Sequence, residues 1–360
     1  MNLFAKIKSF IERPTSLIES ETEFNELALE LFAYQFERNP IYQKICLARQ
    51  LKPLPRLPQH WKEIPLISTD LFKKQRLYSG KQEPIKLFRS SGTTNTDRSI
   101  HYLSVEELEL YETSLWKTFS QAFCLPRKVD YFILAESPTE RGDSSLIHMF
   151  ETIRKKIKAK DNIYFVKSGV LLFDELTNAL NKSIEADTPV LIVGTAFSFV
   201  HLVDSLEHNL KLPSSSVIME TGGFKGKSRE LERTELYAAI SGNLGLPIAN
   251  IVGQYGMSEL GTQYYDSSFR LQSNLPQTRL KKCPHWSRIR VINPNNFQEE
   301  VSEGEIGLLA HCDLANIDSC AFVLSGDIGV RQENNTFELI GRAKKLSLKG
   351  CSLMSDLGNK

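Results

Sequence analysis

The stretch Gly253-Gln-Tyr-Gly-Met-Ser-Glu-Leu-Gly261 indicates the fold of this sequence more directly than any other. It follows an apolar run at residues 248–252, whose pattern predicts a buried β-strand. In parallel α/β sheets, ligands bind at the carboxyl ends of the strands. The hydroxyl of Ser258 and the carboxylate of Glu259, placed just after such a strand, can therefore serve a phosphate group and its Mg²⁺ ion.

The same stretch has a second interpretation, as the nucleophile elbow of a serine hydrolase. That turn requires the pattern Gly-x-Ser-x-Gly, which places a strained serine between a strand and a helix. Here Leu260 occupies the position of the second glycine. The pattern therefore argues against a Ser-His-Asp hydrolase, which would cleave esters without ATP.

A second polar stretch, Arg89-Ser-Ser-Gly-Thr-Thr-Asn-Thr-Asp-Arg98, is the densest group of hydroxyl side chains in the chain. Consecutive hydroxyls around a glycine form a flexible loop rich in backbone N–H and Oγ donors, which suits a triphosphate. The residues do not match the Gly-x4-Gly-Lys-Ser/Thr phosphate-binding loop. On composition alone, an ordinary Ser/Thr turn explains this stretch equally well.

Two glycine-containing turns follow towards the carboxyl end, Ser325-Gly-Asp-Ile-Gly329 and Gly341-Arg-Ala-Lys-Lys345. A carboxylate on a tight turn, such as that of Asp327, can accept hydrogen bonds from two sugar hydroxyls. A nearby guanidinium, such as that of Arg342, can bind ribose or phosphate. Each turn taken alone is more often structural than functional.

The rest of the chain predicts an α/β fold. Helical patterns alternate with short apolar runs between residues 104 and 252, which is typical of a parallel sheet with helical crossovers. Strands are expected at 131–134, 162–166, 189–193, 217–219, 248–252, 288–292, 306–310, 320–324 and 337–340. The expected segments are an N-terminal helical segment at 1–85, an α/β core at 86–270, a β-rich subdomain at 271–340, and a hinge and tail at 341–360.

Composition and charge exclude several classes of protein. The chain has 360 residues, 41% of them hydrophobic, with 44 Lys and Arg against 43 Asp and Glu and a net charge of +1. This length suits one large or two medium domains. A near-neutral chain lacks the basic excess typical of nucleic-acid binders, and its apolar runs are far shorter than the roughly 20 residues that span a bilayer. With no signal-peptide pattern, we expect a cytoplasmic protein whose amphipathic helix at 3–11 is packed.

The six cysteines are scattered without CxxC pairing, so reduced thiols are expected. Cys283, His285, His311 and Cys312 could supply four metal ligands, but their spacing matches no established zinc pattern. We expect packing roles for these four residues. The basic run 154–160 is expected at a helix end, where the helix dipole favours cations, although it could also dock an acidic partner.

The order of these motifs resembles the adenylate-forming superfamily of acyl-CoA synthetases, luciferases and peptide-synthetase adenylation domains. A Ser/Thr loop, Tyr-Gly-Met-Ser-Glu, Gly-Asp-Ile-Gly and Gly-Arg with lysines follow one another between residues 90 and 345. Four further stretches are similar to the acyl-protein synthetases, the fatty-acid-activating subunits of the bacterial bioluminescence fatty acid reductase, and to their non-luminous relatives. These stretches are Gly194-Thr-Ala-Phe197, Met219-Glu-Thr-Gly-Gly-Phe-Lys-Gly226, Asp313-Leu-Ala-Asn316 and Lys349-Gly-Cys-Ser-Leu353.

The resemblance implies a fold, a reaction and a role for each matching residue. The fold is an adenylate-forming large domain with parallel sheets, a β-rich subdomain and a truncated C-terminal segment. The reaction is ATP-dependent activation of a fatty acid to an acyl-adenylate, with Mg²⁺, followed by acyl transfer to a protein thiol. The implied ligands are Ser90, Ser91, Gly92, Thr93 and Thr94 for the ATP phosphates, Ser258 and Glu259 for the phosphates and Mg²⁺, Gly222 and Gly223 against adenine, Tyr255 bordering adenine and the acyl group, Gly256 for ATP, and Asp327 and Arg342 for the ribose.

The chain departs from the superfamily pattern at three points. Asn95 replaces the usual glycine of the phosphate loop, and asparagine tolerates a left-handed conformation better than most residues. Arg98 stands where lysine is usual, which keeps the charge at a position implied to be catalytic. Only 18 residues follow Arg342. The small mobile domain of typical members, with its catalytic lysine, is therefore expected to be absent, as in acyl-protein synthetases.

Cys351 is the candidate acceptor thiol of the second step. It follows Lys344, Lys345 and Lys349, whose positive charge favours the thiolate. A thiol on a terminal tail could carry the acyl group to a partner. The resemblance implies acyl-protein reductase and acyltransferase subunits as partners, or an acyl carrier protein. The alternative is that Cys351 is only a cysteine of the terminal segment.

Two other functions stay open at this point. An acyl-CoA or acyl-carrier-protein ligase would share the first step and deliver the acyl group to pantetheine, with the basic run 154–160 as a docking face. A non-catalytic binder of acyl groups or nucleotides would keep the fold without turnover.

Overall fold

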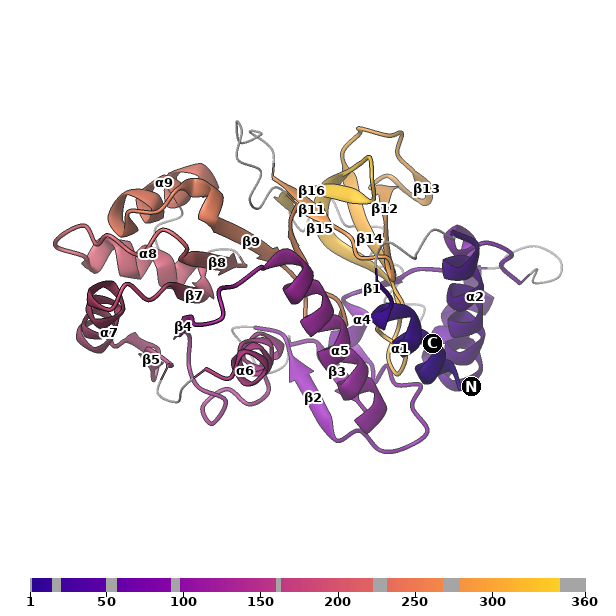
Figure 1. Cartoon of the computed structure of the whole chain (residues 1–360). Coiled ribbons are helices and arrows are strands. Elements are labelled where there is room, and N and C mark those ends of the chain that lie inside the picture. The colour runs from indigo at the N-terminus through magenta and orange to yellow at the C-terminus, as the bar shows by residue number, and fades with distance from the viewer. Residues whose placement is uncertain are drawn as a thin grey trace. The chain divides into compact units, whose positions relative to one another are not determined.

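The computed structural model describes residues 2–14, 21–49, 57–91, 98–159, 163–222, 232–267 and 279–343. Contacts divide the chain into two compact units (Figure 1). Unit 1 comprises Met1–Thr118, Met257–Tyr264 and Leu280–Lys360, and unit 2 comprises Phe119–Gly256 and Tyr265–Arg279. Each unit has a hydrophobic cluster of its own.

Unit 2 is built on a parallel sheet in the strand order β9-β8-β7-β4. The strands are β4 (Asp130–Leu134), β7 (Val190–Thr195), β8 (Val217–Thr221) and β9 (Ile251–Tyr255). The helices between them are α6 (Ser145–Ile157), α7 (Phe173–Glu185), α8 (Ala196–Ser205) and α9 (Arg233–Leu244). These strands are almost wholly buried, as expected for a parallel sheet with helices on both faces.

The helices of unit 2 cover its sheet on both sides. One buried cluster joins Phe132 and Leu134 of β4 to apolar residues of α7, α8 and α9. Because side chains alternate along a strand, Tyr131 points to the opposite face, and its hydroxyl donates a hydrogen bond to the Phe150 carbonyl of α6 at 3.3 Å. Helix α6 ends at Ile157, with basic residues in its last turn, which confirms the predicted helix end.

Two of the predicted strands differ from the structure. Residues Ile248–Asn250 form a 3-10 turn after Pro247, so β9 begins at Ile251. Of the described residues in 162–166, Tyr164 makes only an isolated bridge to the sheet. The chain then pairs β5 (Val166–Lys167) with β6 (Val170–Leu171) as a hairpin, because Ser168 and Gly169 take positive φ values that reverse its direction.

Unit 1 contains the predicted β-rich region as an antiparallel sheet in the order β13-β12-β14-β15-β16-β11. Its strands are β11 (Leu280–Lys282), β12 (Ser287–Asn293), β13 (Asn296–Glu300), β14 (Gly307–Asp313), β15 (Phe322–Gln332) and β16 (Thr336–Arg342). Strand β1 (Ile67–Ser68) pairs with β15 in parallel. Strands β2 (Lys86–Arg89) and β3 (Ile100–Leu103) form a separate hairpin. A short strand, β10 (Tyr264–Asp266), crosses the boundary between the units.

The N-terminal helices of unit 1 pack against this sheet. They are α1 (Leu3–Glu12), α2 (Glu21–Arg38), α3 (Pro40–Arg49) and the short α4 (Leu71–Lys74), while α5 (Val105–Ala122) follows β3. Helix α1 buries Leu3, Ile7, Phe10 and Ile11, which confirms the predicted packed amphipathic helix. Its residues share one buried cluster with apolar side chains of β12, β14 and β15.

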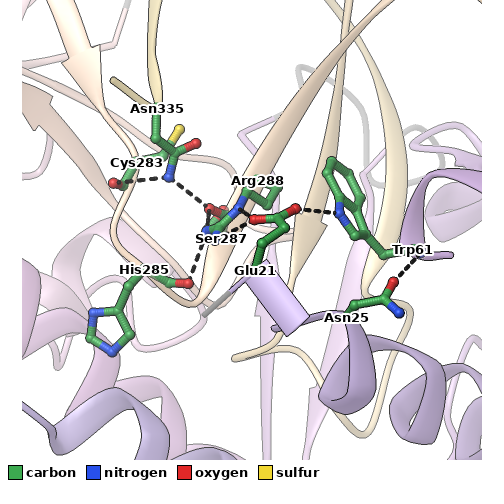
Figure 2. A network of polar contacts seen from close by, with 8 residues as sticks. All are labelled: Glu21, Asn25, Trp61, Cys283, His285, Ser287, Arg288 and Asn335. Atoms are coloured by element: carbon green, nitrogen blue, oxygen red, sulfur yellow. Dashed lines mark hydrogen bonds and ion pairs between the residues drawn. The ribbon is translucent and has the colours of Figure 1, made fainter. Parts of the chain in front are cut away.

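A polar network joins α2 to β12 (Figure 2). The Glu21 carboxylate accepts hydrogen bonds from Trp61 Nε1 at 2.7 Å and from the Arg288 guanidinium at 3.0 Å. Arg288 also donates to the His285 and Ser287 carbonyls and lies over the Phe24 ring. Burial alone would raise the pKa of Glu21, but Arg288 and Trp61 lower it below its ordinary value.

Within the described residues, none of the helices has both the length and the apolar character needed to cross a membrane.

Candidate active site

The hairpin of β2 and β3 holds both ends of the Ser/Thr loop in unit 1. The Ser90 N–H donates to the Ser99 carbonyl at 3.0 Å, and the Ser99 N–H donates to Ser90 Oγ at 2.9 Å. Arg98 Nε donates to the Ser90 carbonyl at 2.6 Å. The hairpin therefore closes the loop at its base. Residues 92–97, with the predicted Gly92, Thr93, Thr94 and Asn95, lie outside the described residues.

Glu259 lies near the residues of three other motifs in unit 1. Its side chain is buried, and burial raises the pKa of its carboxyl above the ordinary value. Ser99 and Arg342 oppose this shift, while the negative charge of Asp327 adds to it. The base of the Ser/Thr loop, Glu259, Asp327 and Arg342 are thus brought together, although they are far apart in the sequence. The prediction of tight turns at Asp327 and Arg342 was wrong: Asp327 lies within β15 and Arg342 ends β16, because the antiparallel pairing of these strands continues through the glycines beside them.

Asp327 and Arg342 face each other on neighbouring strands. They are register partners of β15 and β16, and Arg342 Nε lies 3.9 Å from Asp327 Oδ1. The Asp327 carboxylate is mostly buried, whereas the Arg342 side chain is 70% exposed. Ser325 Oγ accepts a hydrogen bond from the Asp327 N–H and donates one to the Leu309 carbonyl of β14. These two bonds fix this part of β15 against β14. An exposed guanidinium beside a held carboxylate suits a ligand that carries both hydroxyls and negative charge.

In unit 2, a second group of predicted residues lies at the carboxyl ends of β8 and β9. Thr221, at the end of β8, donates through its hydroxyl to the Gln254 side-chain carbonyl of β9. Gly222 follows with a φ of +80°, where an added Cβ would meet nothing within 4 Å. Tyr255 ends β9 nearly buried, and Gly256 after it is exposed. These are the strand ends at which parallel sheets bind ligands. Gly223 lies outside the described residues.

The four residues considered as metal ligands are used in packing and hydrogen bonding. His311 Nδ1 is 3.2 Å from the Tyr264 hydroxyl, and His285 Nε2 is 2.7 Å from the Phe10 carbonyl. Burial lowers the pKa of His311 to about 3 and that of His285 to about 4. Burial also raises the thiol pKa values of Cys283 and Cys312. In the part of the chain that the structure describes, no three His, Cys, Asp or Glu residues form a metal-binding group.

The cysteines in the described part of the chain differ in their exposure. Cys124 is exposed, and Cys46, Cys283, Cys312 and Cys320 are buried. Cys351, the predicted acceptor, lies outside the described residues, as do Lys344, Lys345 and Lys349.

Three residues that the sequence does not predict as functional hold the turn around Glu259. His101 Nδ1 bonds to the Ser258 carbonyl, Asn316 Nδ2 donates to the Glu259 carbonyl, and Asp313 accepts from the Gly261 N–H. Asp313 and Asn316 begin and end one of the stretches that carry the family resemblance. The family resemblance of that stretch was the sequence feature that could have indicated these residues, but it predicts no contact with Glu259.

Solved structures with a similar fold are ligases. The 2-hydroxyisobutyryl-CoA ligase in complex with 2-HIB-AMP and CoA is 14% identical, with a TM-score of 0.63 over 93% of this chain and 82% of that chain. ATP-bound MatB from Rhodopseudomonas palustris is 15% identical, with a TM-score of 0.51 over 73% of this chain; the match spans 49% of MatB. The fold is that of the adenylate-forming ligases, which confirms the predicted fold class.

The family model described as "Acyl-protein synthetase, LuxE" matches residues 9–357, so the chain belongs to this family of ligases. Two relatives are named long-chain-fatty-acid–luciferin-component ligase. The relative from Aliivibrio fischeri is 24% identical over 96% of this chain and 91% of its own length. The relative from Vibrio harveyi is 20% identical over 94% of this chain and 88% of its own length. The resemblance stated from the motifs is confirmed.

Proposed function

We propose that this protein uses ATP and Mg²⁺ to activate a fatty acid as an acyl-adenylate and then transfers the acyl group to a protein thiol. The supporting observation is the group in unit 1 that joins the base of the Ser/Thr loop, Glu259, Asp327 and Arg342. Membership of the acyl-protein synthetase family supports the acyl transfer. The name of the two relatives supports a long-chain fatty acid as the substrate.

Each predicted residue has a role in this proposal. Hydroxyl and N–H donors of the Ser/Thr loop bind the ATP phosphates, with Arg98 as a cation at its end. Asp327 accepts hydrogen bonds from the ribose hydroxyls, and Arg342 adds a positive charge beside them. The complete set is Ser90, Ser91, Gly92, Thr93, Thr94 and Arg98 for phosphates, Gly222, Gly223, Tyr255 and Gly256 for adenine, Asp327 and Arg342 for ribose, and Ser258 and Glu259 for phosphates and metal.

The residues present fit a Mg²⁺ ion. Glu259 supplies a buried carboxylate for which the described residues provide no lysine or arginine at ion-pair distance, and Ser258 beside it supplies a hydroxyl oxygen. Mg²⁺ takes oxygen ligands and is held by one or two carboxylates together with substrate phosphates. The bound ion would neutralise phosphate charge.

The first step joins the fatty carboxylate to the α-phosphorus of ATP. A carboxylate oxygen forms a bond to phosphorus, the bond from this phosphorus to the bridging oxygen breaks, and pyrophosphate leaves. The carboxylate is already ionised at neutral pH, so the enzyme needs no general base. The task of Arg98, Arg342 and the Ser/Thr loop is to position the reactants and to stabilise charge.

The second step moves the acyl group to sulfur. The thiolate of Cys351 attacks the acyl carbon, a carbon–sulfur bond forms, and the carbon–oxygen bond to AMP breaks, so that AMP leaves. The thiol proton is lost to solvent before attack. A partner acyl-protein reductase or acyltransferase, or an acyl carrier protein, would then receive the acyl group, in the cytoplasm.

ATP–pyrophosphate exchange tests the first step. Fatty-acid-dependent exchange is expected, and it should fall at least about tenfold in Glu259→Gln and Asp327→Asn. Glu303→Gln, which changes an exposed carboxylate, is the matched control and should retain wild-type exchange. A series of carboxylic acids of increasing length gives the chain-length preference. Exchange that is absent with every acid contradicts the proposal and favours a non-catalytic binder.

Labelling with tritiated fatty acid tests the second step. Hydroxylamine-labile label is expected on the wild-type chain and on Cys124→Ser, which removes an exposed cysteine. The label should be absent from Cys351→Ser, while pyrophosphate exchange persists. Undiminished labelling of Cys351→Ser removes this cysteine from the mechanism, and acyl-CoA formation on addition of CoA favours a CoA ligase.

A further inference from the structure

The connection between β14 and β15, residues 314–321, is fully buried, as is Asp313 at the end of β14. A buried connection is unusual because each of its backbone polar groups needs a partner inside the protein. Side chains from two helices supply several of these partners. Gln35 of α2 donates to the Asn316 and Ile317 carbonyls, and Glu107 of α5 accepts hydrogen bonds from the Ile317 and Asp318 N–H groups. The connection is therefore held in one conformation.

Side chains of this connection reach the turn that carries Glu259. Asn316 Nδ2 donates to the Glu259 carbonyl at 2.8 Å and to the Cys320 carbonyl at 2.8 Å. The Asp313 carboxylate accepts from the Gly261 N–H at 2.9 Å and from the Thr262 hydroxyl at 2.7 Å. These bonds fix the backbone of the turn after Ser258 to the connection between β14 and β15 and to the end of β14.

His101 of β3 fixes the same turn from its other side. Its Nδ1 lies 2.8 Å from the Ser258 carbonyl, and its side chain has no exposed surface. Because a carbonyl can only accept, His101 Nδ1 carries the proton of this hydrogen bond.

These contacts hold the two peptide planes on either side of Glu259. The Ser258 carbonyl belongs to the plane before the Glu259 Cα atom, and the Glu259 carbonyl belongs to the plane after it. Peptide groups are planar, so fixing both carbonyls fixes φ and ψ of Glu259. The direction of its Cα–Cβ bond is then set by His101 and Asn316 rather than by the side chain itself.

We propose that His101 and Asn316 are positioning residues, which aim the Glu259 carboxylate at the metal-bound phosphates by holding the carbonyls of Ser258 and Glu259. This inference rests on the proposed function, in which Glu259 serves Mg²⁺. In this proposal neither residue contacts the nucleotide. The functional groups of such a site must be positioned to within a fraction of an ångström, which requires supporting contacts of this kind.

Isothermal calorimetry of nucleotide binding without fatty acid tests this proposal. His101→Phe keeps the ring and removes the donor, and Asn316→Leu keeps the volume and removes both hydrogen bonds. Each should raise the Kd for MgATP about tenfold, while the Kd for ATP with EDTA stays within about twofold of wild type. His101→Asn, which retains a donor near the Nδ1 position, should restore most of the affinity. The KM for MgATP in pyrophosphate exchange should follow the same order.

The matched control is Gln35→Met, which loosens the same buried connection without touching the turn. It should lower the melting temperature and leave the Kd for MgATP unchanged. If His101→Phe does not fold, Asn316→Ser carries the test, because serine is too short to reach both carbonyls. Wild-type MgATP affinity in these variants, or an equal loss in Gln35→Met, overturns the inference. No ATP binding by the wild-type chain contradicts the proposed function itself, and the inference with it.

Discussion

Replacing Gly261 by alanine should severely strain the turn that follows Glu259. An added Cβ atom would lie 2.1 Å from the Ala315 carbonyl oxygen and 2.7 Å from its carbonyl carbon. Both are backbone atoms, which cannot rotate away as a flexible side chain can. The two segments must therefore separate by more than about 1 Å to reach an ordinary contact distance.

This separation affects hydrogen bonds as well as packing. The Gly261 N–H and the Ala315 N–H both donate to the Asp313 carboxylate, at 2.9 and 3.1 Å. A shift of about 1 Å takes at least one of them beyond hydrogen-bond range. A buried N–H without a partner costs about 1–3 kcal/mol, and overpacking costs about 1–3 kcal/mol more. We expect Gly261→Ala to lose about 2–6 kcal/mol of unfolding free energy, a large part of the total of a typical domain.

Urea unfolding followed by tryptophan fluorescence measures this loss. Trp286 is a suitable probe because its Nε1 donates to Thr262, next to Gly261. The matched control is Gly242→Ala in α9, where the added Cβ meets nothing within 4 Å. The control should be neutral or stabilised by up to about 1 kcal/mol. An unfolding free energy of Gly261→Ala within about 1 kcal/mol of wild type would refute the argued close approach.

Three further predictions concern buried and paired carboxylates. Burial raises the pKa of Asp313 to about 6 from 3.8, so wild-type stability should fall as pH rises from 4 to 7. When the unfolding free energies of Asp313→Asn and wild type are measured at pH 4 and at pH 7, the variant should gain about 2 kcal/mol relative to wild type between the two pH values. Burial and the charge of Asp318 raise the pKa of Glu107 well above 4.5. The melting temperature of Glu107→Gln should therefore rise relative to that of wild type as pH increases above 4.5. A difference in melting temperature that does not change with pH argues against the raised pKa. For Glu21, whose pKa Arg288 lowers below 4.5 against the effect of burial, the sign is opposite. Glu21→Gln should lose less than about 1 kcal/mol of unfolding free energy at pH 7, because the side chain is 56% exposed. Urea unfolding at several pH values should show this loss shrinking as pH falls below 4.5.

The sequence predicted most of the strands because their patterns are local. Apolar residues in the runs at 131–134, 189–193 and 217–219 indicated strands of the parallel sheet, and the structure has strands at 130–134, 190–195 and 217–221. The start of β9 was placed three residues early, because the apolar pattern at 248 does not show the 3-10 turn that Pro247 begins. The strand predicted at 162–166 was wrong for a related reason. The positive φ at Ser168, which turns the chain into a hairpin, cannot be recognised from the hydrophobic pattern.

The candidate site was predictable only in part. Spacing alone left Asp327 and Arg342 as ordinary turn residues, and the order of the motifs was needed to connect them to Glu259. The contacts of His101 and Asn316 were beyond sequence reasoning, because they join residues 157 and 57 positions apart. A buried histidine and a buried asparagine are also indistinguishable, in one sequence, from polar residues of the core.

Transfer of oxygen from the fatty acid to AMP tests the central claim most directly. If a carboxylate oxygen attacks the α-phosphorus, and the thiol later attacks the acyl carbon, that oxygen stays with the nucleotide. A fatty acid with ¹⁸O in both carboxylate positions should therefore yield AMP that carries one ¹⁸O atom, with pyrophosphate unlabelled, as measured by mass spectrometry. Unlabelled AMP, or ¹⁸O recovered in phosphate together with ADP, would contradict the account.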